Sequence, residues 1–175
     1  MGTKKLKEHN RKLQTTLQCQ INQSFNQLAK KQPNLVISES LSHTFHYNLG
    51  RNMNRRMSAW VKGKLKERLE FKALAKGFGH SQVNPAYSSQ TCLECNFVDR
   101  KNRKGDKFEC LKCGYVGHAD WVAAMNLLRR YYDHEITRFT PYREIKRILL
   151  QRFHRHLETK QLGTVSGRTP DTAAA

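Results

Sequence analysis

The chain has 175 residues, enough for one medium-sized domain with a small module. Lysine and arginine number 32 against 14 acidic residues, and the resulting net charge of +18 predicts a polyanionic partner such as nucleic acid. No apolar run approaches the roughly eighteen residues of a membrane span, and no apolar signal region follows the basic N-terminus, so we expect an intracellular protein with no membrane contact.

Residues 4–31 are predicted to form one long helix whose apolar side chains recur at helical spacing. That stripe consists of Leu6, Leu13, Leu17, Ile21, Phe25 and Leu28. Pro33 ends the helix, and the stretch LVISESL at 35–41 then predicts a buried strand. Glu39 follows the apolar run of this strand directly. Cys19 lies within the helix, and we interpret it as a bystander.

A loop is expected at 42–52 and a second long helix at 53–76. The inner face of this helix is predicted to hold Met57, Trp60, Val61, Leu65, Leu69 and Ala73. Nine lysines and arginines lie between Arg51 and Lys76. They could face phosphate groups or simply solvent. A short strand is expected at 80–84, before Pro85.

Two CxxC pairs follow, and in a reducing compartment they indicate a metal site rather than disulfides. The pairs are Cys92 with Cys95 and Cys110 with Cys113, with fourteen residues between them. Four thiolates satisfy the tetrahedral preference of zinc and leave no open position for water or substrate. The predicted Zn²⁺ is therefore structural, and His118 is interpreted as a structural or surface histidine.

The residues after each second cysteine support this prediction. Asn96 and Gly114 stand there, and these two residue types adopt positive φ most easily, as a CxxC turn usually requires. Lys104, Gly105 and Asp106 predict a tight turn between two short strands.

Asp120 is predicted to open a third helix, and a basic fourth helix is expected at 142–158. The inner face of the third would carry Trp121, Ala124, Met125, Leu128 and Tyr132, and that of the fourth Tyr142, Ile145, Leu149, Phe153 and Leu157. The outer face of the fourth would carry Arg143, Lys146, Arg147, Arg152 and Arg155. Residues 159–175 show no periodicity and are expected to be a disordered tail.

Two of the 14 acidic residues stand apart from the others by their place in the predicted elements. Glu39 alone follows an apolar strand, and Asp120 alone joins the cysteine module to an apolar helix. Acids at strand ends and helix starts are the usual ligands of Mg²⁺ in phosphodiester-cleaving enzymes. The simpler alternatives are a surface acid at a strand end and a helix N-cap.

Four stretches of the chain resemble the C-terminal part of the TnpB proteins of insertion sequences, which are related to type V CRISPR effectors. They are LVISESL (35–41), RRMSAWVKGKLKERLEFKA (55–73), VNPAYSSQTCLEC (83–95) and KFECLKCGYVGHADWVAAMNLL (107–128). The resemblance implies an RNA-guided DNA endonuclease of a transposon or CRISPR-type system, in a prokaryotic cytoplasm near the nucleoid. Its RuvC-like nuclease fold would carry an inserted zinc ribbon, and an Asp-Glu-Asp site would bind Mg²⁺. Glu39 matches the second acid and Asp120 the third.

The chain departs from this family pattern at the first acid. The family's first aspartate lies on a strand ahead of the long helix, whereas residues 1–34 contain only Glu8 as an acid. Val122 also stands where the family usually has asparagine. We therefore expect an α/β fold that is a partial RuvC-like (RNase H-like) domain without its first strands. Its parts would be a nuclease core at 1–87 and 118–135, a zinc ribbon at 88–117 and a basic helix at 136–158.

Three interpretations follow from the missing acid. The chain could be one part of a split effector that binds DNA and a guide RNA. A protein partner or second copy would complete the nuclease sheet, and a chain paired with this one would carry the first aspartate. This chain would then be inactive alone. It could instead be a truncated transposon remnant, or a nuclease-dead zinc-ribbon protein that binds DNA or RNA.

Overall fold

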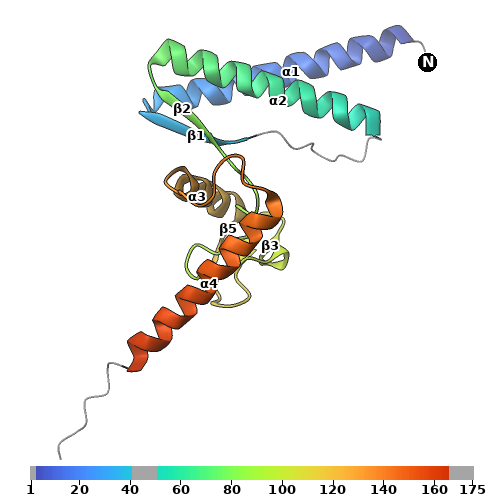
Figure 1. Cartoon of the computed structure of the whole chain (residues 1–175). Helices are drawn as coiled ribbons and strands as arrows, with labels where there is room; N and C mark the ends of the chain where they lie inside the picture. The colour runs from blue at the N-terminus through green and yellow to red at the C-terminus, as the bar shows by residue number, and fades with distance from the viewer. Residues whose placement is uncertain (1–2, 41–50, 166–175) are drawn as a thin grey trace, which may run out of the picture. The chain divides into compact units, whose positions relative to one another are not determined.

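The computed structural model describes residues 3–40 and 51–165 and forms two compact units, Met1–Ser81 and Gln82–Ala175. The elements combine helices with short strands, so the predicted mixed α/β class is confirmed (Figure 1). No described helix is long and apolar enough to cross a membrane.

Two long helices and a small sheet make up the N-terminal unit. Helix α1 (Thr3–Lys30) runs beside α2 (Arg51–Lys76), as Figure 1 shows, while β1 (Leu35–Glu39) pairs with β2 (Gly79–Val83). Ala29, Leu69 and Phe78 form the buried centre between these elements. The four elements predicted here are confirmed to within about two residues at each described boundary. The predicted loop lies largely outside the described residues, but Arg51 and Asn52 already belong to α2.

His80 links the two strands of this unit. Its Nε2 lies 2.9 Å from Ser38 Oγ, and burial holds the pKa of the imidazole below its ordinary value near 6.5, although Glu70 acts in the opposite direction. The folded unit therefore favours the neutral ring.

The N-terminal unit should consequently lose stability at mildly acidic pH. Above about 6.5 both folded and unfolded chains hold neutral His80, so its contribution is complete. As the pH falls from about 6.5 through the lowered pKa, the unfolded chain takes up the proton first, so this contribution to stability is lost. Urea unfolding of α1 and α2, monitored by hydrogen exchange from pH 7.5 to pH 5, should show this loss of stability. His80→Gln should make the free energy of unfolding less dependent on pH. An unchanged slope in His80→Gln would contradict the assignment.

The C-terminal unit is built around a small antiparallel sheet. Strands β3 (Arg103–Lys104), β4 (Lys107–Glu109) and β5 (Val116–His118) lie in that order, with Arg103 opposite Phe108 and Phe108 opposite Gly117. A 3-10 turn, η1 (Arg100–Asn102), precedes β3, and Gly105 adopts φ +61° in the predicted tight turn. Helices α3 (Ala119–Tyr131) and α4 (Tyr142–Val165) complete the unit.

The predicted inner face of α3 is wrong. Trp121 is 61% exposed, and Leu128 and Tyr132 are exposed as well. The buried positions are Ala119, Val122, Asn126 and Arg130, which lie on another side of the helix. Polar residues occupy this face because the neighbouring backbone needs donors: Asn126 Nδ2 donates to the carbonyls of Ser88 and Thr91, both at 2.8 Å.

Helix α4 follows its prediction at the centre and departs from it elsewhere. Ile145, Leu149 and Phe153 are buried as expected, but Tyr142 and Leu157 are exposed. Arg152, predicted on the outer face, is instead engaged by acids of the preceding loop. The helix continues to Val165, so the start of the predicted disordered tail is helical, and the rest lies outside the described residues.

Candidate functional site

Four cysteine sulfurs converge within the C-terminal unit. The Sγ atoms of Cys92, Cys95, Cys110 and Cys113 all lie within 4.8 Å of one another. Two of the separations are 3.5 Å, between Cys92 and Cys113, and 3.6 Å, between Cys95 and Cys110. A tetrahedral zinc with bonds of about 2.3 Å needs sulfurs about 3.8 Å apart, so the four thiols could bind this ion with little adjustment.

Each pair of cysteines lies on a turn that repeats the same backbone pattern. The N–H of Asn96 donates to Cys92 O at 3.2 Å, and the N–H of Gly114 donates to Cys110 O at 3.0 Å. Asn96 has φ +62° and Gly114 has φ +73°, which confirms the conformation predicted for these positions. Backbone N–H groups of Glu94 and Lys112 also point at Cys92 Sγ and Cys110 Sγ, each at 3.4 Å. Such donors stabilise thiolates.

The thiols differ in their environments. Burial raises the pKa of Cys92 to about 11 and also raises the pKa of Cys95. Burial alone would raise the pKa of Cys110 too. Hydrogen bonds from the backbone N–H groups of Cys113 and Lys112 outweigh burial and hold this pKa below its ordinary value. A metal ion must therefore displace protons from Cys92 and Cys95 when it binds near neutral pH.

The cysteine module shares its core with the helices that follow it. Cys92, Cys95 and Cys110 belong to one buried cluster with Phe108, Ala119, Val122 and Phe153. Val122, the residue that departs from the family pattern, is fully buried there and packs from α3. Three of the four clustered cysteines and the first turn of α3 therefore belong to one packed core.

Asn102 joins the two cysteine turns and was missed by the sequence reasoning. Its side chain is almost fully buried. Its Nδ2 donates to Gln90 O at 3.0 Å and Phe97 O at 3.3 Å, while its Oδ1 accepts from the N–H of Leu111 at 3.1 Å. The flanking sequence, DRKNRKGDK, is so basic that it gave no sign of a buried residue.

Asp120 is positioned by the cysteine module. Strand β5 runs directly into α3, and the N–H of Ala119 donates to Asp106 O at 2.7 Å. The carboxylate of Asp120 is 69% exposed and lies 3.0 Å from Arg103 Nη2 of β3. The alternative of an N-cap role is wrong, because the cap is His118, whose Nδ1 accepts from the N–H of Asp120 at 3.3 Å. That bond confirms the structural role expected of His118.

Glu39 is the last residue of β1 and is partly exposed. It belongs to the N-terminal unit, whereas Asp120 belongs to the C-terminal unit. The structure therefore brings the four cysteines together and assigns the two acids to separate units. The pairing of Glu39 with Asp120 stays a prediction. Cys19 lies exposed on α1, separate from the cysteine cluster of the described residues.

Comparisons with known proteins match the part of the chain that contains the cysteine module. Residues 63–127 match the family model described as Cas12f1-like, TNB domain. The TnpB-like protein aq_aa05 of Aquifex aeolicus is 32% identical over 136 residues, which cover 75% of this chain and 44% of that protein. The CRISPR-associated endodeoxyribonuclease Cas12f1 of Sulfoacidibacillus thermotolerans is 36% identical over 75 residues, 42% of this chain and 18% of that protein.

This chain is a relative of the TnpB and Cas12f proteins. The chain spans less than half the length of either curated relative, the Aquifex aeolicus protein or the Sulfoacidibacillus thermotolerans Cas12f1. A cryo-EM structure of CasPhi-2 (Cas12j) bound to crRNA and phosphorothioate-DNA is similar over 69% of this chain and 19% of the CasPhi-2 chain. The TM-score is 0.51 at 24% identity, which is a likeness of fold.

Proposed function

We propose that the chain is the C-terminal portion of a TnpB-like, RNA-guided DNA endonuclease, with a partial RuvC-like core and an inserted zinc ribbon. The observation that carries this proposal is the placement of Asp120. The cysteine module holds this exposed carboxylate at the first turn of α3 through the bond from Ala119 to Asp106 and the contact with Arg103. A metal-stabilised module that ends in a rigidly held acid suits a nuclease better than it suits a simple binding ribbon.

The proposed partners are DNA and a guide RNA. The net charge of +18 favours a phosphate-rich partner, and a relative is named as a CRISPR-associated endodeoxyribonuclease. A protein partner or a second copy would complete the nuclease sheet, and a different polypeptide would supply the first aspartate. Binding of nucleic acid should weaken steeply with salt, because each phosphate that a lysine or arginine neutralises releases counterions.

The two acids offer the donors that Mg²⁺ prefers. Glu39 and Asp120 each present a carboxylate, and oxygen ligands of this kind suit hard divalent cations. Bound Mg²⁺ would supply charge stabilisation for phosphodiester cleavage. Arg103 already neutralises Asp120, so it would hold the carboxylate in place before a cation competes for it. The four cysteines would hold a structural Zn²⁺.

Reconstituted cleavage tests the nuclease proposal. The chain alone should not cut DNA, whereas the chain with a polypeptide bearing the missing aspartate and a guide RNA should cut it with Mg²⁺. Glu39→Gln or Asp120→Asn should then abolish cutting without weakening DNA binding, because each removes a negative ligand of the metal site. Glu94→Gln, at an exposed acid within the cysteine module, is the matched control. Full cutting by either acid variant would overturn the assignment.

One observation favours a second candidate, a zinc-ribbon protein that binds DNA or RNA without cutting it. The ion pair with Arg103 occupies the carboxylate of Asp120, as a purely structural acid would be occupied. In that case no partner restores cleavage. Salt-dependent binding would then be the same in Glu39→Gln, Asp120→Asn and the unmodified chain.

A further inference from the structure

The loop between α3 and α4 presents an aromatic side chain to solvent. Phe139 is 86% exposed and lies at a turn in which the N–H of Thr140 donates to Thr137 O at 3.2 Å. Exposed aromatic residues flank it along the chain at Tyr132 and Tyr142. A single exposed apolar side chain is ordinary on a protein surface. The way this loop is built is what gives Phe139 a role.

Hydrogen bonds fix the tip of the loop from two sides. Thr140 Oγ1 accepts from the N–H of Thr137 at 2.9 Å and lies 3.1 Å from Thr137 Oγ1. Buried Asn84 donates through Nδ2 to the carbonyls of Arg138 at 3.2 Å and Thr140 at 3.0 Å. The carbonyls on both sides of Phe139 are therefore anchored, which fixes the backbone that carries the exposed ring.

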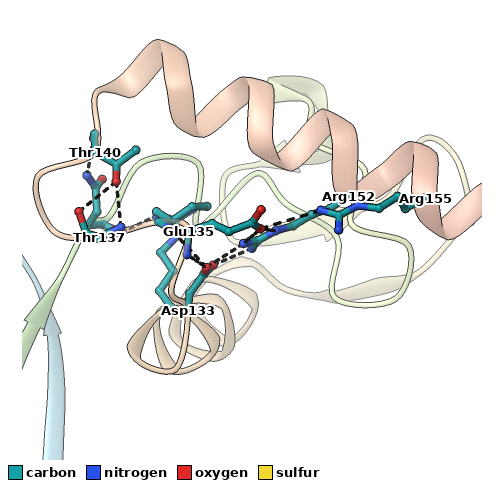
Figure 2. Close-up of polar contacts among 9 residues, drawn as sticks. Asp133, Glu135, Thr137, Thr140, Arg152 and Arg155 are labelled. Atoms are coloured by element: carbon teal, nitrogen blue, oxygen red, sulfur yellow. Dashed lines mark hydrogen bonds and ion pairs between the residues drawn. The ribbon is translucent and has the colours of Figure 1, made fainter.

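The start of the loop is fixed by an ion-pair network, shown in Figure 2. Asp133 Oδ1 accepts from the N–H groups of Glu135 at 3.0 Å and Ile136 at 3.1 Å. Arg152 of α4 forms ion pairs with the carboxylates of Asp133 and Glu135. Ile136 is buried in a hydrophobic cluster of the C-terminal unit. The loop is thus a rigid support for Phe139, so little conformational entropy would be lost when a ligand binds to the ring.

The charge around Phe139 identifies the kind of ligand. Arg138 lies over its ring, with the guanidinium carbon 5.8 Å from the ring centre. Arg152 neutralises Asp133 and Glu135, and Arg147 pairs with Glu144. Within the described part of the chain, Arg138, Arg143 and Lys146 have no acidic partner, so the exposed charge beside the loop is positive. An aromatic face beside unpaired cations suits a nucleobase with its phosphate, because every base can stack on a ring.

We infer that the loop of residues 132–141 is a platform on which Phe139 stacks against an unpaired nucleobase, while Arg138 contacts the adjoining phosphate. The inference rests on the proposed nucleic-acid binding and adds to it a preference for single strands at this loop. It applies to unpaired bases of DNA or RNA alike, since both present the same aromatic face. A base within a duplex is already stacked on both sides and would gain nothing from Phe139.

Binding of short oligonucleotides tests the inference. The zinc-loaded full chain would be titrated by fluorescence anisotropy into labelled single-stranded DNA, single-stranded RNA and duplex DNA of equal length. Phe139→Ala should weaken single-strand binding about 5- to 150-fold and leave duplex binding and the salt slope unchanged. Phe139→Trp should restore affinity. Phe139→Leu should not, because leucine keeps apolar area without a stacking face.

A matched control and a second readout separate the possible outcomes. Phe71→Ala removes another exposed phenylalanine with an arginine over its ring, Arg68 at 5.2 Å on α2, and should change nothing. Quenching of 2-aminopurine in the single strands should occur with the unmodified chain and fail with Phe139→Ala. Equal affinities of the Phe139→Ala and unmodified chains overturn the stacking inference alone. Full retention of single-strand affinity by Phe139→Leu, with quenching lost, would show an apolar contact without stacking and also overturns it. Absence of all nucleic-acid binding overturns the proposed function with it.

Discussion

Removal of the proposed Zn²⁺ is expected to unfold the cysteine module and the start of α3 while α1 and α2 stay folded. The reason is that Cys92, Cys95 and Cys110 lie in one buried cluster with Phe108, Val122 and Phe153. Structural zinc contributes about 10–16 kcal/mol of apparent binding free energy in zinc-finger peptides, which matches or exceeds the roughly 5–15 kcal/mol stability of an ordinary domain. Without the ion, nothing would tie the two cysteine turns to each other, and the binding free energy would be lost from this cluster.

Hydrogen exchange before and after chelation measures this effect. Protected amides such as those of Asn96 and Gly114 should exchange freely in the chelated chain, and Cys92→Ser should behave in the same way. Cys19→Ser is the matched control, because this cysteine is exposed on α1. Calorimetry in two buffers should also show proton release on zinc binding, since the pKa of Cys92 is raised to about 11. Full protection in the chelated chain would show that the metal is not structural.

Asp133→Asn should destabilise the C-terminal unit by about 2–3 kcal/mol. Arg152 forms a bidentate ion pair with Asp133, with Nη1 at 2.6 Å from Oδ2 and Nη2 at 2.7 Å from Oδ1. Breaking a buried pair costs about 3–5 kcal/mol, and the lower figure expected here reflects the 26% exposure of Arg152. Asparagine keeps Oδ1 as an acceptor for the N–H of Ile136 but loses the charge and the Oδ2 acceptor, so the loss falls on the pair with Arg152.

Urea unfolding of the zinc-loaded chain, with hydrogen exchange to isolate this unit, measures the loss. Arg147→Ala is the control, since it removes an exposed pair with Glu144 and should cost under about 0.5 kcal/mol. Burial alone would raise the pKa of Asp133, but the bonds from Arg152 and from the backbone hold it below its usual value. The contribution of the pair should therefore be complete above about pH 4 and disappear as the pH falls through that lowered pKa. Equal losses in the two variants would contradict the ion-pair argument.

Local features of the cysteine module could be predicted from the sequence because the spacing alone determines them. Two CxxC pairs followed by Asn96 and Gly114 specify turns with positive φ, and both turns form. Buried polar residues could not be predicted in this way. Asn102 and Asn126 are buried because distant backbone carbonyls need donors, and no periodic pattern records that need.

The face of α3 shows why periodicity alone is insufficient. Trp121, Leu128 and Tyr132 form an apolar stripe of helical period, which predicts a buried face, yet they are exposed in the described structure. The buried face of the helix instead carries Val122 and Arg130. Arg130 donates a hydrogen bond to Asn84 O, and burial lowers the pKa of Arg130 to about 10. Hydrophobic spacing identifies a helix and its period, whereas tertiary contacts decide which face is covered.

The sharing of one core by the cysteine turns and Phe153 has a practical consequence for protein engineering. The stretch that matches the family model ends at residue 127, before α4 begins. A chimaera carrying only residues 63–127 would leave uncovered the apolar surfaces on which Ile145, Leu149 and Phe153 pack, and it should aggregate. The smallest transplantable piece therefore runs from about residue 82, where the second unit begins, through at least Phe153.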